Sequence, residues 1–385
     1  MAGTDRRGFL KGGLVAAGSL GLGITAWSKL TGHAHPPQPH QALGPLQITI
    51  DQTTGLPLLQ LPKGFRYRSF VWAGEKLGDG YSSPGAGDGM GVVNDQNGIV
   101  TLIRNHELRG SNGPVGDSRK AWDITGGGTS TLKFDTRKER LVDSRISLGG
   151  TLNNCAGGVT PWGTWLSCEE APFTPGLKHL GGDLNQRLWR LGNAKKSHGY
   201  VFEVSPEGDS EPQPIIAMGQ FYHEAAAVDP ESGVVYMTED ANPYAGLYRY
   251  LPDVPGDLKA GGSLQMLRVD GYRELIETVP LHKPMEFGWV DIAYPGQGHT
   301  AGTHDGRGVV TQGIAAGATP FVALEGCVFH QGSIYFTSKS GGKARAGQIF
   351  RLDIAAGILE LIYEATAQDS FTGPDNIVIS PKGSL

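Results

Sequence analysis

A short pattern recurs along this chain: a glycine, then a run of alternating apolar residues, then an abrupt polar or acidic end. It occurs at four places, 98–107, 163–170, 233–240 and 332–339. An alternation with a period of two is typical of half-buried β-strands, and a leading glycine is typical of a turn. A second strand-like run follows several of them, at 199–206, 246–252 and 347–353. The pattern predicts small antiparallel sheets repeated along the sequence.

Repeated small sheets favour a β-propeller, because radial repetition leaves only short, protected strand edges. It also brings strand ends that are distant in sequence to one mouth of a central channel. We therefore expect an all-β fold, a β-propeller of six blades with irregular insertions. Residues 375–385 resemble a strand and a turn without a following strand. We expect either an incomplete last blade or one completed by the N-terminal strand around Leu46 to Ile50.

The N-terminus carries a twin-arginine export pattern, with Arg6 and Arg7 ahead of a mild apolar run from Gly12 to Trp27. The run is rich in Gly and Ala, whereas a stable membrane span needs roughly 20 strongly apolar residues. We predict a signal peptide over 1–34, recognised by the twin-arginine export machinery, and a single propeller domain over 35–385. The mature protein would be periplasmic or secreted, without a stable membrane span. An uncleaved, membrane-anchoring N-terminus is the alternative.

The charge balance points to a small-molecule partner. The 385 residues include 33 basic and 38 acidic ones, for a net charge of −5, and the basic residues are scattered. Neither a nucleic-acid surface nor a polybasic membrane patch is indicated. We expect a monomer that acts on a small molecule.

Three cysteines cannot form a disulfide framework, and an odd number in an exported protein implies at least one free thiol. Cys155 is the candidate, because two asparagines precede it and Gly157 and Gly158 follow it closely. Such a turn could hold a thiolate on iron or zinc with its backbone amides. Cys168 and Cys327 lie in apolar strand-like runs and are predicted to be core residues.

Several acidic residues lie in apolar surroundings, which predicts a cation site. Glu169 and Glu170 stand between Trp-Leu and Ala-Pro-Phe, and Glu224 runs into three alanines. Adjacent carboxylates in such a setting repel each other and lose hydration, so a bound cation is the natural compensation.

Other motifs exclude competing functions. His106 and His223 each precede a glutamate, but the second histidine of a zinc-protease motif is missing. Both remain open as metal ligands or as residues that orient the glutamates. The Gly-rich segment 79–91 lacks the Lys of a phosphate loop and is predicted to be a rim loop, and Asp95 to Gly98 a hairpin turn.

The order and content of several segments closely resemble the PhoX family of calcium- and iron-dependent alkaline phosphatases. These segments are 64–67, 104–107, 151–158, 167–170, 223–230, 236–240, 325–327 and 374–377. The resemblance implies a six-bladed propeller, exported by the twin-arginine route, whose channel binds Fe³⁺ and Ca²⁺ and hydrolyses small-molecule phosphate esters. Motif by motif, it assigns catalytic roles to Cys155, Glu224 and Glu325. It assigns metal binding to Glu107, Cys155, Glu169, Glu170, Glu224, Glu239, Asp240 and Glu325.

One position departs from that family, because Ala323 stands where an arginine is expected two residues before Glu325. An arginine there would clamp phosphate with two parallel hydrogen bonds. Bound metals would neutralise charge in the transition state and activate water for attack on phosphorus. Two other hypotheses stay open: a calcium-dependent propeller esterase or lactonase, and a noncatalytic exported propeller stabilised by metals.

Overall fold

The computed structural model describes residues 44–110, 113–176, 194–208, 210, 212–369, 371–380 and 383–385. The predicted signal peptide, 1–34, lies outside them. The described residues form two compact units. The smaller contains the described residues up to Glu75 together with Ile377–Leu385, and the larger is Lys76–Asn376. No described helix is both long enough and apolar enough to cross a membrane.

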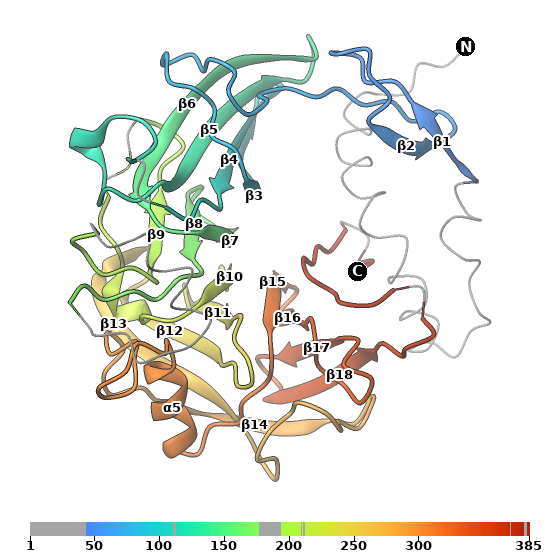
Figure 1. The fold of residues 1–385 in the computed structure, drawn as a ribbon. Helices are drawn as coiled ribbons and strands as arrows, with labels where there is room; N and C mark the ends of the chain where they lie inside the picture. Colours follow the sequence, from blue (N-terminus) through green and yellow to red (C-terminus); the bar gives the residue numbers. More distant parts are fainter. Residues whose placement is uncertain are drawn as a thin grey trace. The chain divides into compact units, whose positions relative to one another are not determined.

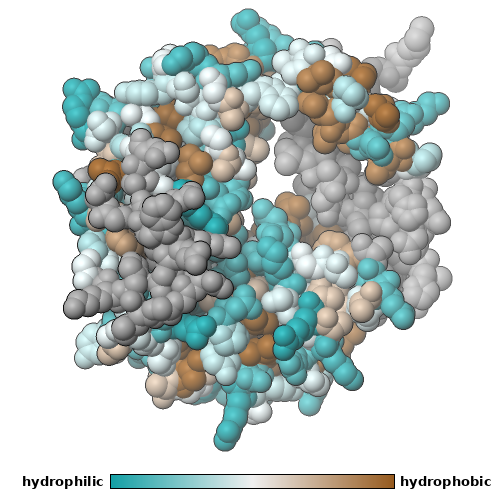
Figure 2. Space-filling model, viewed as in Figure 1, coloured by the Kyte–Doolittle hydropathy of each residue, from teal (hydrophilic) through white to brown (hydrophobic). Residues whose placement is uncertain are grey.

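In the smaller unit, β1 (Leu46–Thr49) pairs antiparallel with β2 (Leu59–Pro62). The predicted strand around Leu46 to Ile50 therefore exists, and among the described strands its partner is β2. The short hairpin leaves several of its leucines and isoleucines exposed, which gives a largely apolar surface over β1 and β2 (Figure 2).

The described part of the larger unit contains antiparallel sheets of four, three and nine strands (Figure 1). The nine-stranded sheet consists of two up-and-down groups of four strands linked by β14 (Met285–Asp291), and we call these groups the third and fourth sheets. The first sheet is β3 (Gly87–Gln96), β4 (Ile99–His106), β5 (Gly127–Asp135) and β6 (Arg140–Thr151). The second is β7 (Asn154–Val159), β8 (Trp165–Glu169) and β9 (Val201–Val204). The third is β10 (His223–Val228), β11 (Val235–Glu239), β12 (Leu247–Val254) and β13 (Asp257–Val269). The fourth is β15 (Leu324–His330), β16 (Ser333–Ser338), β17 (Gln348–Asp353) and β18 (Ile358–Glu364).

Few other elements occur in the described part of the chain. Strand β14 (Met285–Asp291) pairs with β13 and touches β18 through two residues, so it joins the third and fourth sheets. The helix α5 (Gly308–Ala315) and the 3₁₀ turns η1 (Ser118–Lys120) and η3 (Ile216–Met218) lie in connections. The hairpin predicted at Asp95 to Gly98 is confirmed, because Asn97 and Gly98 both have positive φ, at 55° and 80°, between β3 and β4.

The first strands of the four sheets, β3, β7, β10 and β15, lie next to one another in series, as in a propeller (Figure 1). Small residues allow this close approach. A Cβ on Gly89 would lie 2.6 Å from Cα of Ala156, and one on Gly158 would lie 1.8 Å from the backbone oxygen of Ala226. The glycine-led runs of the sequence are the second strands, β4, β8, β11 and β16, rather than the innermost ones.

Aromatic and aliphatic side chains fill the space between the sheets. Phe321, Phe336 and Phe350 pack edge-to-face and stacked within one buried cluster. Cys327 belongs to the same cluster and Cys168 to a neighbouring one, which confirms that both are core residues.

Candidate metal centre

All four sheets begin with the same local geometry. The first residue of the inner strand pairs with the last residue of the second strand, and a β-bulge follows at once. The pairs are Gly87 with His106, Asn154 with Glu169, His223 with Glu239, and Leu324 with Ser338. Because a bulge re-aims side chains, the same register repeated four times places equivalent residues at equivalent points.

A backbone hydrogen bond completes this repeated corner. The amide that follows the second strand donates to the carbonyl of the residue that precedes the inner strand. The four bonds are Glu107 to Ala86 (2.8 Å), Glu170 to Asn153 (3.0 Å), Asp240 to Tyr222 (3.1 Å) and Lys339 to Ala323 (2.8 Å). Ala323, at which the resemblance led us to expect an arginine, accepts one of these bonds and is a buried residue with φ of 43°.

Two sets of side chains follow from this register. The inner set is the second residue of each inner strand: Asp88, Cys155, Glu224 and Glu325. The corner set is the residue after each second strand: Glu107, Glu170, Asp240 and Lys339. Six of these eight residues are carboxylic acids, one is a thiol and one is an amine.

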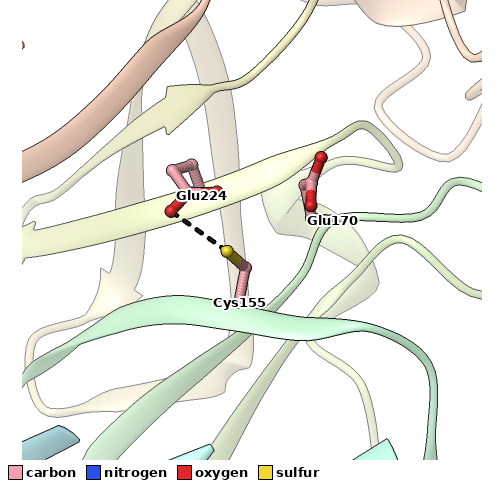
Figure 3. Close-up of side chains that lie close together, drawn as sticks. All are labelled: Cys155, Glu170 and Glu224. Atoms are coloured by element: carbon pink, nitrogen blue, oxygen red, sulfur yellow. Dashed lines mark hydrogen bonds between the residues drawn. The ribbon is translucent and has the colours of Figure 1, made fainter. Parts of the chain in front are cut away.

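The inner set converges. Cys155 Sγ donates to Glu224 Oε1 over 3.2 Å (Figure 3) and lies 3.7 Å from Asp88 Oδ2. Ligand atoms of Cys155, Glu170 and Glu224 all lie within 4.8 Å of one another, a group we call the thiol trio.

A second group with the same spacing, which we call the oxygen trio, consists of Glu224, Glu325 and Asp375. Glu224 belongs to both trios. Its carboxylate therefore joins the second and fourth sheets through the third.

Burial makes this convergence costly without a cation. Glu224 is 3% exposed and Glu325 is 2% exposed. Burial, with the neighbouring carboxylates, raises the pKa of Glu224 well above its usual range, that of Glu325 to about 8 and that of Glu170 to about 7. It also raises the pKa of the Cys155 thiol, which Glu224 and Asp88 raise further. Without a cation, Glu224, Glu325 and the Cys155 thiol are therefore mostly protonated at neutral pH.

The donor atoms fit a metal ion. The buried Glu325 Oε1 has no hydrogen-bond partner among the described atoms, although Lys339 Nζ lies 3.2 Å away as an ion-pair partner. A buried, unbonded carboxylate oxygen is rare, because it loses hydration without compensation. Together, the carboxylates of the two trios and the Cys155 thiol form a ligand set that divalent or trivalent cations would satisfy.

Arg109 flanks the thiol trio. Its Nη2 donates to Glu107 Oε1 over 2.6 Å and lies 3.6 Å from Glu170 Oε2, and its Nε donates to Asn153 Oδ1. Asn153 in turn donates to Glu170 Oε2 over 2.9 Å. Arg109 thus holds two corner carboxylates in place.

Glu169 is not brought into either trio. It is fully buried and accepts from the backbone amides of Leu152, Gly199 and Tyr200, at 2.7 to 3.1 Å. Its Oε1 also lies 2.8 Å from His198 Nδ1. Both oxygens are therefore saturated by the protein.

Glu239 occupies the equivalent position in the third sheet and lies outside both trios as well. Its Oε2 accepts from Tyr248 (2.7 Å) and Gly246 (2.9 Å). Its Oε1 has no hydrogen-bond partner among the described atoms, and burial raises its pKa to about 8.

The two histidines hydrogen-bond to other parts of the fold. His106 bonds to Gly85 O and Ser130 Oγ, both at 2.9 Å, and His223 bonds to Gly219 O at 3.0 Å. Burial lowers their pKa values to about 4 and about 3. Both are neutral at physiological pH, and their hydrogen bonds hold the starts of two inner strands rather than a glutamate.

Three residues at the centre escape prediction from the sequence: Asp88, Lys339 and Asp375. Asp88 lies in the segment 79–91, and the prediction of a rim loop there is wrong from Gly87 onward, where β3 begins. A signal was present, because each inner-set residue is followed by Gly or Ala, as the close inner strands require. Asp375 is held by its backbone oxygen, which accepts from Gly326 N and Thr337 Oγ.

The raised pKa values predict the stability of the metal-free protein. Glu170, Glu239 and Glu325 have pKa values of about 7 to 8 when folded, against 4.5 for an ordinary glutamate in the unfolded chain. Between these limits the folded state binds more protons, so stability falls as pH rises. We expect the unfolding midpoint of the metal-free protein to be lower at pH 9 than at pH 5, and iron and calcium together to reduce the difference. A metal-free midpoint that is higher at pH 9 would contradict this electrostatic description.

The fold and the site together define a propeller whose inner strands present candidate metal ligands. The family "alkaline phosphatase PhoX" matches residues 118–385. This chain belongs to that family, and it is a metal-dependent phosphomonoesterase.

Comparison with one solved structure confirms the β-propeller. Pseudomonas fluorescens PhoX in complex with vanadate, a transition state analogue, shares 18% identity and a TM-score of 0.53, over 77% of this chain and 73% of that one. A putative glucose dehydrogenase from Thermus thermophilus shares 14% identity over 82% and 78%, with a TM-score of 0.36. No curated protein matches the chain.

Proposed function

We propose that this protein is an exported alkaline phosphatase that hydrolyses small-molecule phosphate monoesters at a centre of iron and calcium. The observation that carries the proposal is the convergence of the inner set, in which Glu224 is shared by the thiol trio and the oxygen trio. The twin-arginine pattern at Arg6 and Arg7 supports export to the periplasm or beyond.

Ligand chemistry supports the assignment of the ions. The thiol trio contains a sulfur, which favours a transition metal, so Cys155, Glu170 and Glu224 would bind iron as Fe³⁺. The oxygen trio offers oxygen ligands alone, which suit Ca²⁺. Glu107 and Asp240, at two other corners, would bind further calcium.

The chain's own residues prepare this reaction. When bound, the cations would neutralise phosphate charge and lower the pKa of water to give a nucleophile at neutral pH. Glu170, Glu224, Glu325 and the Cys155 thiol would release their protons as the ions enter, so loading is favoured at higher pH. Arg109 would hold Glu107 and Glu170 in the geometry required. Glu169 and Glu239 would contribute by fixing the ends of β8 and β11.

Metal removal tests the proposal. The protein, exported by its own signal, should hydrolyse p-nitrophenyl phosphate and lose roughly a hundredfold or more of that activity after exhaustive chelation. Iron and calcium together should restore the rate, whereas calcium alone should not. Unchanged turnover without metal would contradict the proposal. Cleavage of p-nitrophenyl acetate or a lactone instead would favour the esterase, and bound metal without any turnover would favour a noncatalytic propeller.

A further inference from the structure

We propose that Lys339 is the residue that binds the substrate's phosphate, through its ammonium group, at the edge of the oxygen trio. The inference rests on the proposed function. It assigns a role in the reaction to the residue that ends the last of the four repeated runs, 332–339. Two observations carry it: the repeated corner geometry and the contacts of one side chain.

Lys339 occupies the fourth corner position. The other three described sheets place Glu107, Glu170 and Asp240 there, each tied by its amide to the residue before the inner strand. The fourth sheet makes the same bond, 2.8 Å from Lys339 N to Ala323 O, but carries a cation. The same backbone geometry thus places an acidic side chain at three equivalent positions around the centre and an amine at the fourth.

The ammonium lies directly against the proposed ion ligands. Its Nζ is 2.6 Å from Asp375 Oδ2 and 3.2 Å from Glu325 Oε1, two of the three members of the oxygen trio. The side chain is 47% exposed, whereas Glu325 is 3% exposed as a side chain. Asp375 is 57% exposed, so Lys339 and Asp375 both lie on the solvent side of the buried Glu325, where a phosphate approaching the centre would meet the ammonium.

Charge explains why an amine at this point is informative. A lysine that served only to neutralise carboxylates would repel the cations that the same carboxylates are suited to bind. Once a cation neutralises Glu325 and Asp375, the ammonium keeps its three donors for an anion. A phosphate monoester carries the charge and the oxygen acceptors that complement a cation and an ammonium together.

A second cation near the centre, Arg109, is already committed. Arg109 uses Nε on Asn153 and Nη2 on Glu107, and it also lies near Glu170. It flanks the thiol trio and holds ligands of that trio. Lys339 is thus the cation among the inner and corner sets that metal loading would release toward substrate.

The test uses the metal-loaded full chain with Lys339→Met and Lys339→Arg. Inorganic phosphate is the probe, measured by calorimetry, beside bound metal and the kinetic constants for p-nitrophenyl phosphate. We expect Lys339→Met to weaken phosphate binding roughly tenfold or more, because a charge-assisted hydrogen bond is lost. Bound metal should stay equal or increase, and Lys339→Arg should recover most of the phosphate affinity.

Lys133→Met is the matched control, because Lys133 also pairs with a carboxylate, Glu207 at 3.0 Å, but outside the inner and corner sets. It should leave phosphate binding unchanged. The inference is overturned if Lys339→Met binds phosphate as the wild type does, or if it loses metal in proportion to phosphate. A loaded wild type that neither binds nor hydrolyses phosphate would overturn the proposed function as well.

Discussion

Replacing Glu224 by glutamine is expected to abolish phosphatase activity, with a loss of at least about a thousandfold, and to remove metal from both trios. Glu224 is the shared member of the thiol trio and the oxygen trio. It is 3% exposed, so water cannot take its place as a ligand without rearrangement. The loss of several kcal/mol of charge stabilisation in the transition state corresponds to such a factor. The measurements are metal content and turnover of p-nitrophenyl phosphate.

Glu203→Gln provides the matched control. Glu203 lies on β9 and accepts from Trp162 Nε1 and Thr164 Oγ1, both at 2.7 Å. It is a hydrogen-bonded glutamate of a neighbouring strand that belongs to neither trio. The variant should retain metal and activity. A Glu224→Gln protein that is folded, fully loaded and active would remove Glu224 from the centre.

Replacing Glu169 by glutamine is expected to destabilise the fold by about 3 to 5 kcal/mol, the usual cost of breaking a buried ion pair. His198 lies between Glu169 (2.8 Å) and Asp123 (3.4 Å), and these carboxylates raise its pKa to about 9 despite burial. The histidine is therefore charged at neutral pH. Glutamine would remove one of the two negative charges that stabilise the charged His198. Its NH₂ group would also point at hydrogen-bond donors, because both oxygens of Glu169 accept hydrogen bonds from the protein.

Thermal unfolding and metal content per folded molecule measure this effect. The exposed Glu207, which pairs with Lys133, gives the control, and Glu207→Gln should change stability by less than about 1 kcal/mol. If Glu169→Gln unfolds at the wild-type temperature but loses metal, Glu169 is a ligand, as the motif resemblance implies. If it is destabilised and keeps its metal when folded, Glu169 is a structural residue of β8.

The sequence predicts the sheets better than the centre. Alternating apolar runs identify β4, β8, β11 and β16, since a period of two survives in a single strand. The innermost strands are not recognised in the sequence, because their close packing requires small residues. Residues such as Gly89 and Gly158 do not contribute to an alternating apolar pattern. Six blades are predicted, and the described residues show four such sheets.

The residues of the centre are only partly predictable. An acidic residue at the end of an apolar run can be recognised in the sequence, but the direction in which its side chain points cannot, so Glu169 and Glu170 receive the same prediction. In the structure the carboxylate of Glu169 is saturated by backbone amides, whereas that of the next residue, Glu170, belongs to the thiol trio. The two side chains differ because successive strand residues face opposite sides of the sheet. The repeated runs 98–107 and 332–339 end at Glu107 and Lys339, but the backbone bond that places both residues at the centre is not visible in the sequence.

The most direct measurement of the central claim is anomalous X-ray scattering at the iron edge, from crystals of protein exported by its own signal. If the inner set converges on shared cations, an iron peak should lie within bonding distance of both Cys155 Sγ and a carboxylate oxygen of Glu224. These two atoms, Sγ and Oε1, are 3.2 Å apart in the structure. Crystals of active enzyme with no anomalous peak between these two residues, or with the metal bound elsewhere, would contradict it.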